Sequence, residues 1–304
     1  MRFGGHQTFF IREGWLHKGL KLLIEDEDRD EKLLTHEISA DYLGVGKNMA
    51  MSIRHWLVAT ELAIHELNEN GKSQKNLLPS KLGRIIWKND PYFAEESTWW
   101  ILHVNLVHSV DSAYTWNWFF NHFNFERFDR SICVELLERK VTLSKGIKSS
   151  RSTLDRDALC MFGSYARSIP AQNKDPEESI DCPFSELGLI NYYRTTGYYQ
   201  VNKDIKNIDF SVFMYSLSLL FSNDNAEYID IPFYDLVRVD NSPGKIFQLS
   251  NEALFELLVS YEAESDGDLK IRGLAGERQI VVKNRSSEEW LEHLYQFIDE
   301  GILV

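Results

Sequence analysis

Residues 3–19 read FGGHQTFFIREGWLHKG, which joins two adjacent glycines, a polar His-Gln-Thr triplet and a run of apolar residues. The glycines permit backbone conformations that other residues avoid, or a close approach to a neighbouring group. Because the apolar run at residues 9–11 is expected to be buried, it would hold the triplet on a fixed backbone. In one interpretation His6 and Gln7 only bond to backbone groups, and in the other they belong to a functional site.

The clearest local motif lies at residues 37–62 and predicts a helix-turn-helix. Residues 38–43 and 47–62 are the two predicted helices, and the glycine-rich residues 44–46 are the turn. Apolar residues recur along one face of the second helix, so that face is expected to be buried. The opposite face carries side chains of the types that contact phosphates and base edges. The candidate DNA-binding residues on this helix are Lys47, Asn48, Ser52 and Arg54.

A β-hairpin after the second helix would be the wing of a winged helix-turn-helix. Residues 63–67 and 76–79 flank a polar loop that contains Asn70-Gly71, a dipeptide typical of tight hairpin turns. The loop also carries Lys72 and Lys75, which we add to the candidate DNA-binding residues. The alternative is a structural motif only, since many helical pairs with a glycine turn never contact DNA.

The rest of the chain is predicted to be mainly helical. Residues 97–110 form a helix that is apolar on nearly every side, which places it in the core. Helices are predicted at residues 129–141 and from residue 152 onward, and the basic loop between them contains Arg151, a further DNA-binding candidate. A β-hairpin is predicted at residues 192–201, and strands are predicted at residues 269–272 and 279–282.

Residues 173–178 are polar and include a proline, which is typical of a linker. The sequence therefore predicts an N-terminal helical domain at residues 1–172 and a C-terminal α+β domain at residues 173–304. The expected fold class is mainly α with small β-hairpins, an α+β fold in which an N-terminal winged helix-turn-helix-like unit packs on a helical body.

Composition favours a soluble, globular protein, with 43% hydrophobic and 26% charged residues among 304. No apolar run reaches the length of about 18 residues that a membrane span needs, and no signal-peptide pattern is present, so we expect a cytoplasmic protein without a membrane partner. The three cysteines, Cys133, Cys160 and Cys182, lack the paired spacing of a zinc site. We expect them to be buried free thiols.

The formal net charge of −13 argues against a protein that coats nucleic acid through its overall charge. Basic residues nevertheless cluster at residues 72–88 and 139–156, whereas acidic residues gather at residues 25–28 and 252–268. Such runs are usually solvated faces. Their separation along the chain also permits a basic groove on an acidic body.

Three blocks of sequence carry a resemblance to a known family. The opening block extends to residue 20 as FGGHQTFFIREGWLHKGL, the second comprises residues 90–92 and 98–103, and the third is residues 181–190. Together they resemble the SspB-like family of bacterial DNA phosphorothioation proteins, long catalogued only as a domain of unknown function. The first block is the most specific, and the three reach about two thirds of the way along the chain.

This resemblance implies a strand-nicking, DNA-binding component of a bacterial phosphorothioation and phage-defence system. It implies double-stranded DNA as a ligand, and a cysteine desulfurase, an ATPase and a sulfurtransferase-like protein as partners. A homodimer is also expected, because helix-turn-helix proteins often read two half-sites. One alternative is a non-catalytic DNA-binding adaptor or regulator that positions a separate DNA-modifying enzyme. Another is an assembly protein whose acidic surface binds a basic partner.

No standard catalytic signature is present in the sequence. A nicking reaction would need a nucleophile held near a phosphate and a neutralised developing charge, usually supplied by Mg or Mn on carboxylates. The block that matches the family most closely supplies the candidate catalytic residues His6, Gln7, Arg12 and Lys18. His6 would act as general base or metal ligand, while Arg12 or Lys18 would stabilise phosphate charge. The metal ligands themselves are not identified by the sequence.

Overall fold

The computed structural model describes residues 3–27, 33–34, 39–144, 149–169, 182–221, 226–274 and 277–301. The chain divides into two compact units. The first contains residues Met1–Phe119 and Phe123–Gln200, and the second contains Phe120–His122 and Val201–Val304. The domain boundary predicted at residues 173–178 lies outside the described residues.

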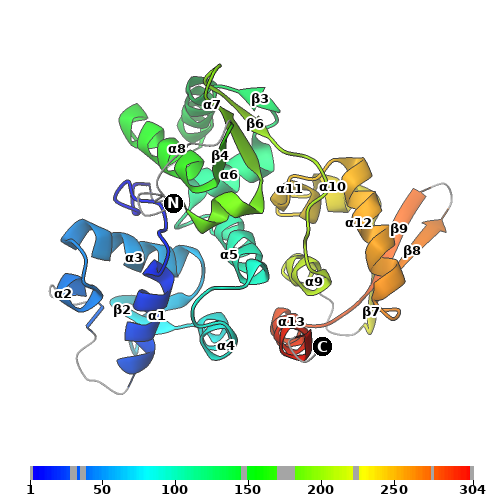
Figure 1. The fold of residues 1–304 in the computed structure, drawn as a ribbon, viewed down its shortest axis with the longest axis horizontal. Coiled ribbons are helices and arrows are strands. Elements are labelled where there is room, and N and C mark those ends of the chain that lie inside the picture. The colour runs from blue at the N-terminus through cyan, green and yellow to red at the C-terminus, as the bar shows by residue number, and fades with distance from the viewer. Residues whose placement is uncertain are drawn as a thin grey trace. The chain divides into compact units, whose positions relative to one another are not determined.

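The first unit begins with helices and one hairpin (Figure 1). In chain order these elements are α1 (Trp15–Glu25), α2 (Ser39–Leu43), α3 (Lys47–Ala59), β1 (Ala63–Leu67), β2 (Ser73–Pro79) and α4 (Lys81–Asn89). Helix α1 packs against α3 and β2. The two helices approach closely at Gly19, where an added Cβ would lie 2.7 Å from the Ile53 side chain. Glycine at this position therefore sets the distance between α1 and α3.

The helices and hairpin predicted at residues 38–79 are present in the predicted order. Gly44 has φ of 65° and follows α2 directly, as expected for a residue that ends a helix. Helix α3 ends at Ala59, earlier than the predicted end at Leu62. Strands β1 and β2 pair antiparallel, and the side chain of Asn68 accepts hydrogen bonds from the backbone N–H groups of Asn70 and Lys72 in the turn.

The rest of the first unit, as far as its residues are described, contains helices, a short 3₁₀ helix and strands. These elements are α5 (Glu96–His108), α6 (Tyr114–His122), β3 (Arg127–Phe128), α7 (Arg130–Leu143), α8 (Arg151–Tyr165), β4 (Ala166–Ile169), the 3₁₀ helix Pro183–Leu187, β5 (Ile190–Tyr193) and β6 (Tyr198–Val201). As predicted, α5 is buried along most of its length. Its His103 is fully buried and shares a hydrogen bond with the Tyr165 hydroxyl, so this histidine belongs to the core.

The four strands form one sheet in the order β3-β6-β5-β4. Strand β4 continues directly from α8 and pairs parallel with β5, with Ala166 opposite Ile190. Strand β3 pairs antiparallel with β6. The sequence predicted a hairpin at residues 192–201 but neither β4 nor its parallel pairing, because that pairing joins segments that are separated along the chain.

The second unit is also a mixture of helices and strands. Its elements are α9 (Phe210–Ser218), β7 (Tyr228–Pro232), α10 (Phe233–Arg238), α11 (Pro243–Ile246), α12 (Asn251–Glu264), β8 (Leu269–Leu274), β9 (Glu277–Lys283) and α13 (Ser287–Gly301). The strands form an antiparallel sheet in the order β7-β9-β8, which confirms the strands predicted at residues 269–272 and 279–282. Ser286 and Glu289 bond reciprocally at the start of α13 as a capping box.

The α+β fold class predicted from the sequence is confirmed. The predicted burial of the cysteines is confirmed as well, and no disulfide joins Cys133, Cys160 and Cys182. Burial raises the pKa of the Cys133 and Cys160 thiols above its ordinary value, so both stay protonated and unreactive at neutral pH. Within the described part of the chain, no helix is both long and apolar enough to cross a membrane.

Candidate nucleic-acid interface

The opening segment forms a tight turn against α3. Gly4 has φ of 71°, and Gln7 and Thr8 also adopt positive φ values of 52° and 69°. An added Cβ on Gly5 would lie 2.5 Å from Nδ1 of His55, so only glycine fits without displacing that ring. Gly4 is thus required for its left-handed backbone conformation, and Gly5 is required for its close approach to the His55 ring.

His6 is 1% exposed, and both of its ring nitrogens have protein partners. The backbone N–H of Thr8 donates to Nδ1 at 3.0 Å, so Nε2 carries the ring proton and donates it to Asp157 at 3.0 Å. Asp157 also accepts hydrogen bonds from the Gly4 N–H at 2.8 Å and from the Thr115 hydroxyl at 3.3 Å. A buried carboxylate with three donors therefore fixes the opening segment to α8 and α6.

The other candidate catalytic residues lie in different surroundings. The Arg12 guanidinium lies over the rings of Phe9 and Trp15, at 5.6 and 5.4 Å from their centroids. Lys18 is exposed on α1, and Gln7 is partly exposed in the turn. Among the described residues, no hydrogen bond or ion pair joins the side chains of any two of the four candidates. The structure brings His6 to a carboxylate but leaves its ring without an open position for water or metal.

Helix α3 has a buried face and an exposed face. Ser52 is fully buried and donates to the Phe9 carbonyl at 3.3 Å, and Trp56 Nε1 donates to the same oxygen at 3.0 Å. Ser52 therefore attaches α3 to the opening segment, on the side away from solvent. Lys47 and Asn48, at the first two positions of the helix, are exposed.

The β1–β2 hairpin adds two exposed lysines to this region. Lys72 lies in the turn and Lys75 on β2, and both side chains are exposed. Arg54 of α3 donates a short hydrogen bond to the backbone carbonyl of Lys75. Arg54 thus ties the hairpin to α3, whereas the exposed candidates on the two elements are Lys47, Asn48, Lys72 and Lys75.

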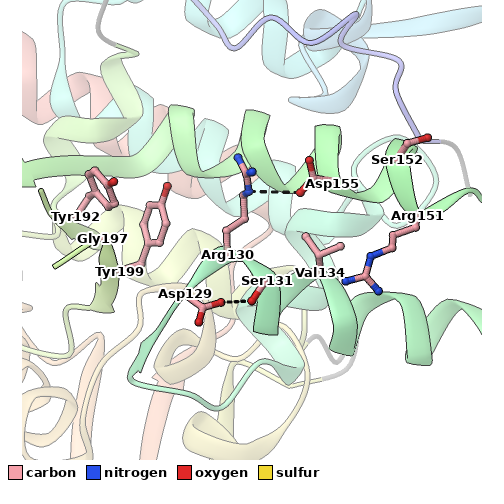
Figure 2. A pocket seen from close by; sticks show the side chains of 10 residues that line it. All are labelled: Asp129, Arg130, Ser131, Val134, Arg151, Ser152, Asp155, Tyr192, Gly197 and Tyr199. Carbon is pink, nitrogen blue, oxygen red and sulfur yellow. Dashed lines mark hydrogen bonds and ion pairs between the residues drawn. The ribbon is translucent and has the colours of Figure 1, made fainter.

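A separate open pocket of about 890 Å³ lies between α7, α8 and the β5–β6 hairpin (Figure 2). Its lining residues are Asp129, Arg130, Ser131, Val134, Arg151, Ser152, Asp155, Tyr192, Gly197 and Tyr199. Figure 2 shows the two tyrosines at one end, Arg151 and Ser152 at the other, and Arg130 beside Asp155 between them. The volume lies in the range of about 300–1,000 Å³ that is usual for small-molecule sites.

Two ion pairs cross between α7 and α8 at this pocket. Arg130 Nε lies 3.3 Å from Asp155 Oδ1, with both side chains about two fifths exposed. Arg151, a predicted DNA-binding residue, donates from Nη1 to Glu138 at 2.7 Å. Each bond uses one of several guanidinium N–H groups, so the remaining donors of both arginines can meet a ligand.

The pKa values of two lining residues are shifted by their surroundings. Hydrogen bonds from the Ser131 hydroxyl and the Ile132 backbone N–H lower the pKa of Asp129, which caps the start of α7 as an ionised carboxylate. Burial raises the pKa of Tyr199, and nearby Tyr192 raises it further while Arg130 opposes the shift. Tyr199 is therefore a neutral hydroxyl group at physiological pH.

The described residues contain no group of three or more His, Cys, Asp or Glu side chains that could hold a metal ion. The pocket carboxylates are already engaged, Asp129 by the start of α7 and Asp155 by Arg130. This donor set does not fit a preformed site for Mg or Mn.

Arg151 was predicted from the sequence as a DNA-binding residue, whereas the pocket itself was not predicted. Tyr192 and Tyr199 were assigned only to a hairpin, and Arg130 and Asp129 only to a helix. Their aromatic and charged types carry no spacing that marks a site. The pocket forms because β4 follows α8 and pairs with β5, which brings the hairpin beside the two helices.

Comparison with known proteins identifies the family and the fold. The family of proteins of unknown function designated DUF4007 matches residues 3–297. Two solved structures are similar over 98% of this chain and 87% of theirs. One is a crystal structure of SspB, at 23% identity and a TM-score of 0.80, and the other is a magnesium-bound crystal structure of SspB, at 22% identity and a TM-score of 0.81. No curated protein sequence matches the chain significantly.

The likeness to SspB that the opening block predicted is confirmed at the level of the fold. It extends through both compact units, since nearly the whole chain is covered. The family match likewise begins at Phe3 and includes the turn that holds His6. The chain belongs to the DUF4007 family and has the fold of SspB.

Proposed function

We propose that this chain is a DNA-binding component of an Ssp-type DNA phosphorothioation system, where it takes part in nicking one strand. The fold that it shares with SspB supports the place in that system. The observation that carries DNA binding is the exposed set of basic and amide side chains on α3 and the β1–β2 hairpin. Its partners in this proposal are the cysteine desulfurase, the ATPase and the sulfurtransferase-like protein, and a second copy of the chain.

Helix α3 has the properties of a recognition helix. Such a helix presents its N-terminal residues to base edges in the major groove, and Lys47 and Asn48 are the first two residues of α3. Lysine can pair with guanine and asparagine with adenine there. Ser52 is left out of the proposed contact because it is buried against Phe9.

The hairpin would contact the backbone beside α3. Lys72 and Lys75 are exposed and can neutralise phosphates. Arg54 acts in this proposal as a positioning residue, since its hydrogen bond to the Lys75 carbonyl links the hairpin to α3. A local surface of this kind binds DNA despite a net charge of −13, because phosphate contacts depend on the charges at the interface.

Duplex binding measured by fluorescence anisotropy tests the proposal. One charge-assisted hydrogen bond contributes about 1.5 kcal/mol, so Lys72→Ala with Lys75→Ala should weaken binding at least about tenfold. The matched control is Lys203→Ala with Lys270→Ala, which removes two exposed lysines of the second unit. Equal affinities for the two double variants would contradict the proposed interface.

A second candidate function is a non-catalytic adaptor that binds DNA and positions another enzyme. Two observations favour it: both ring nitrogens of His6 are engaged, and the described residues hold no metal-binding group. Magnesium is bound in one SspB structure, and Mg²⁺ commonly uses one or two carboxylates together with phosphate oxygens and water. The carboxylates described above do not form such a site on their own.

Relaxation of supercoiled plasmid separates the two functions. Purified protein that binds duplex and relaxes plasmid in the presence of Mg or Mn is a nickase. Protein that binds duplex and leaves the plasmid supercoiled, alone and with the partner proteins, is an adaptor. Protein that neither binds nor relaxes DNA would contradict both functions and favour an assembly role.

A further inference from the structure

We infer that the pocket between α7, α8 and the β5–β6 hairpin binds an unpaired nucleobase of a DNA strand. Three features carry this inference: aromatic rings at one end, a lining whose two arginines and two aspartates cancel in formal charge, and the exposed side chain of Arg151 at the other end. The inference rests on the proposed DNA-binding function but concerns a surface other than α3 and the hairpin β1–β2.

The aromatic end is a stack of rings that reaches from the core to the pocket. The rings of Phe162 and Tyr199 are stacked, with centroids 4.5 Å apart and an interplanar angle of 26°. The Tyr192 ring follows, tilted by 34° from the Tyr199 ring, with centroids 4.7 Å apart. Phe162 is fully buried, whereas both tyrosines are partly exposed and line the pocket. A planar base placed here would extend an existing stack, as in proteins that bind single strands.

The charges of the pocket favour a neutral ligand over a bare phosphate. Its lining contains two arginines and two aspartates, so the formal charges cancel. Asp155 uses Oδ1 and Arg130 uses Nε in their ion pair. Within the described residues, Oδ2 of Asp155 and the Nη groups of Arg130 have no protein partner. A nucleobase edge offers both donors and acceptors. It can therefore accept hydrogen bonds from Arg130 and donate one to Asp155.

The hydroxyl groups of the two tyrosines support the same ligand class. A tyrosine hydroxyl keeps its proton at physiological pH, and burial raises the pKa of Tyr199 further, so this hydroxyl can donate to a base acceptor. Figure 2 shows the Tyr199 hydroxyl on the side of its ring toward the helix that carries Asp155. Both tyrosines and the Arg130–Asp155 ion pair line the same pocket.

The position of Arg151 indicates how the base would remain part of a strand. Arg151 lies at the end of the pocket opposite the tyrosines and is more than half exposed. A strand whose base enters at the tyrosines would place a neighbouring phosphate near Arg151. The pocket volume of about 890 Å³ exceeds the space that one base fills, which leaves room for sugar and phosphate. Proteins that act on a base in DNA commonly bind it outside the helical stack.

The test measures binding of a labelled single strand of about 12 nucleotides by anisotropy. Tyr192→Ala should weaken this binding at least about fivefold, since stacking on one aromatic ring contributes that much or more. Tyr192→Phe, which keeps the ring and removes only the hydroxyl, should weaken binding less than Tyr192→Ala does. Tyr192→Leu, which keeps apolar packing on β5, should weaken it as much as Tyr192→Ala does. The matched control is Tyr198→Ala on the same hairpin, where Tyr198 is exposed and stands outside the pocket lining.

The outcomes distinguish this inference from the proposed function. Duplex binding that survives Tyr192→Ala, together with weakened single-strand binding, supports the pocket. Equal single-strand binding by wild type, Tyr192→Ala and Tyr198→Ala overturns it and leaves the duplex interface intact. If a strand that lacks its central bases binds equally well, the inference is overturned and the pocket binds phosphate. If a free deoxynucleotide binds as tightly as the strand, the inference is also overturned and the pocket binds soluble nucleotides. Failure to bind either duplex or single strand counts against both proposals.

Discussion

Asp155 and Asp157 stand two positions apart on α8 and have opposite surroundings. Asp157 is 3% exposed and accepts hydrogen bonds from three donors of the first unit. The side chain of Asp155 is 43% exposed, pairs with Arg130 and lines the pocket. The buried carboxylate of Asp157 thus holds the opening segment in place, while the carboxylate of Asp155 is accessible to a ligand. The carboxylate that contacts the opening block, Asp157, therefore has a structural role. Ligand binding requires accessible side chains, as at Asp155.

Replacing the two aspartates in turn should separate these roles most strongly. Asp157→Ala leaves the donors of Gly4, His6 and Thr115 without their acceptor, and each unsatisfied donor costs about 1–3 kcal/mol, so the total loss should be at least about 3 kcal/mol. Asp155→Ala removes an exposed ion pair, for which about 0–1 kcal/mol is expected. Chemical denaturation measures both changes in the free energy of unfolding. Equal losses would abolish the contrast between the two sites.

The His6→Ala variant tests the same buried contact by removing the histidine that donates to Asp157. We expect unfolding free energy to fall by about 2–3 kcal/mol, because Asp157 loses a donor and the aromatic cage around the ring is left with a cavity. Affinity for duplex DNA, measured at matched concentrations of folded protein, should not change. A stable variant with tenfold weaker DNA binding would instead place His6 at the ligand.

The pH dependence of stability provides a third comparison, with the half-buried His108 of α5. Burial lowers the pKa of His108 to about 4, whereas an unfolded histidine titrates near 6.5. The unfolded chain therefore binds more protons between these values, and stability should fall as pH falls from about 6.5 to 4. The expected loss at pH 5, relative to neutral pH, is about 2 kcal/mol. Denaturation of His108→Gln across this range should show a shallower decline, and an unchanged decline would assign it to other groups.

The smallest expected effect is at the mouth of the pocket. Arg151→Gln breaks the exposed pair with Glu138, so stability should change by about 0–1 kcal/mol. Single-strand binding should weaken about twofold to fivefold, because one exposed phosphate contact is lost. Anisotropy at low salt measures this change. Strengthened binding would show that Arg151 does not face the strand.

Much of the local structure could be predicted because its causes lie close together in the sequence. Each of three signals determines only the structure next to it. Gly44 ends a helix, Asn70-Gly71 turns a hairpin, and the apolar residues 97–110 form a buried helix. The likeness to SspB also rested on contiguous blocks. These elements, the fold class and the burial of the cysteines followed from local patterns.

The candidate sites could not be predicted in the same way, because they depend on contacts across the chain. His6 and Asp157 are 151 residues apart, and nothing near either one indicates the other. Ser52 was assigned to the DNA-facing side of its helix, yet the Phe9 carbonyl holds it inside. Tyr192 reaches α8 only through a parallel strand pair, which no local repeat encodes.

The most direct test of the central claim is the salt dependence of duplex binding by wild type and by the Lys72→Ala, Lys75→Ala variant. If both lysines contact phosphates, the slope of log affinity against log salt should become shallower by about 1.8, since each contact contributes about 0.9. The Lys203→Ala, Lys270→Ala control should keep the wild-type slope. Parallel slopes for all three proteins would contradict DNA binding through this hairpin.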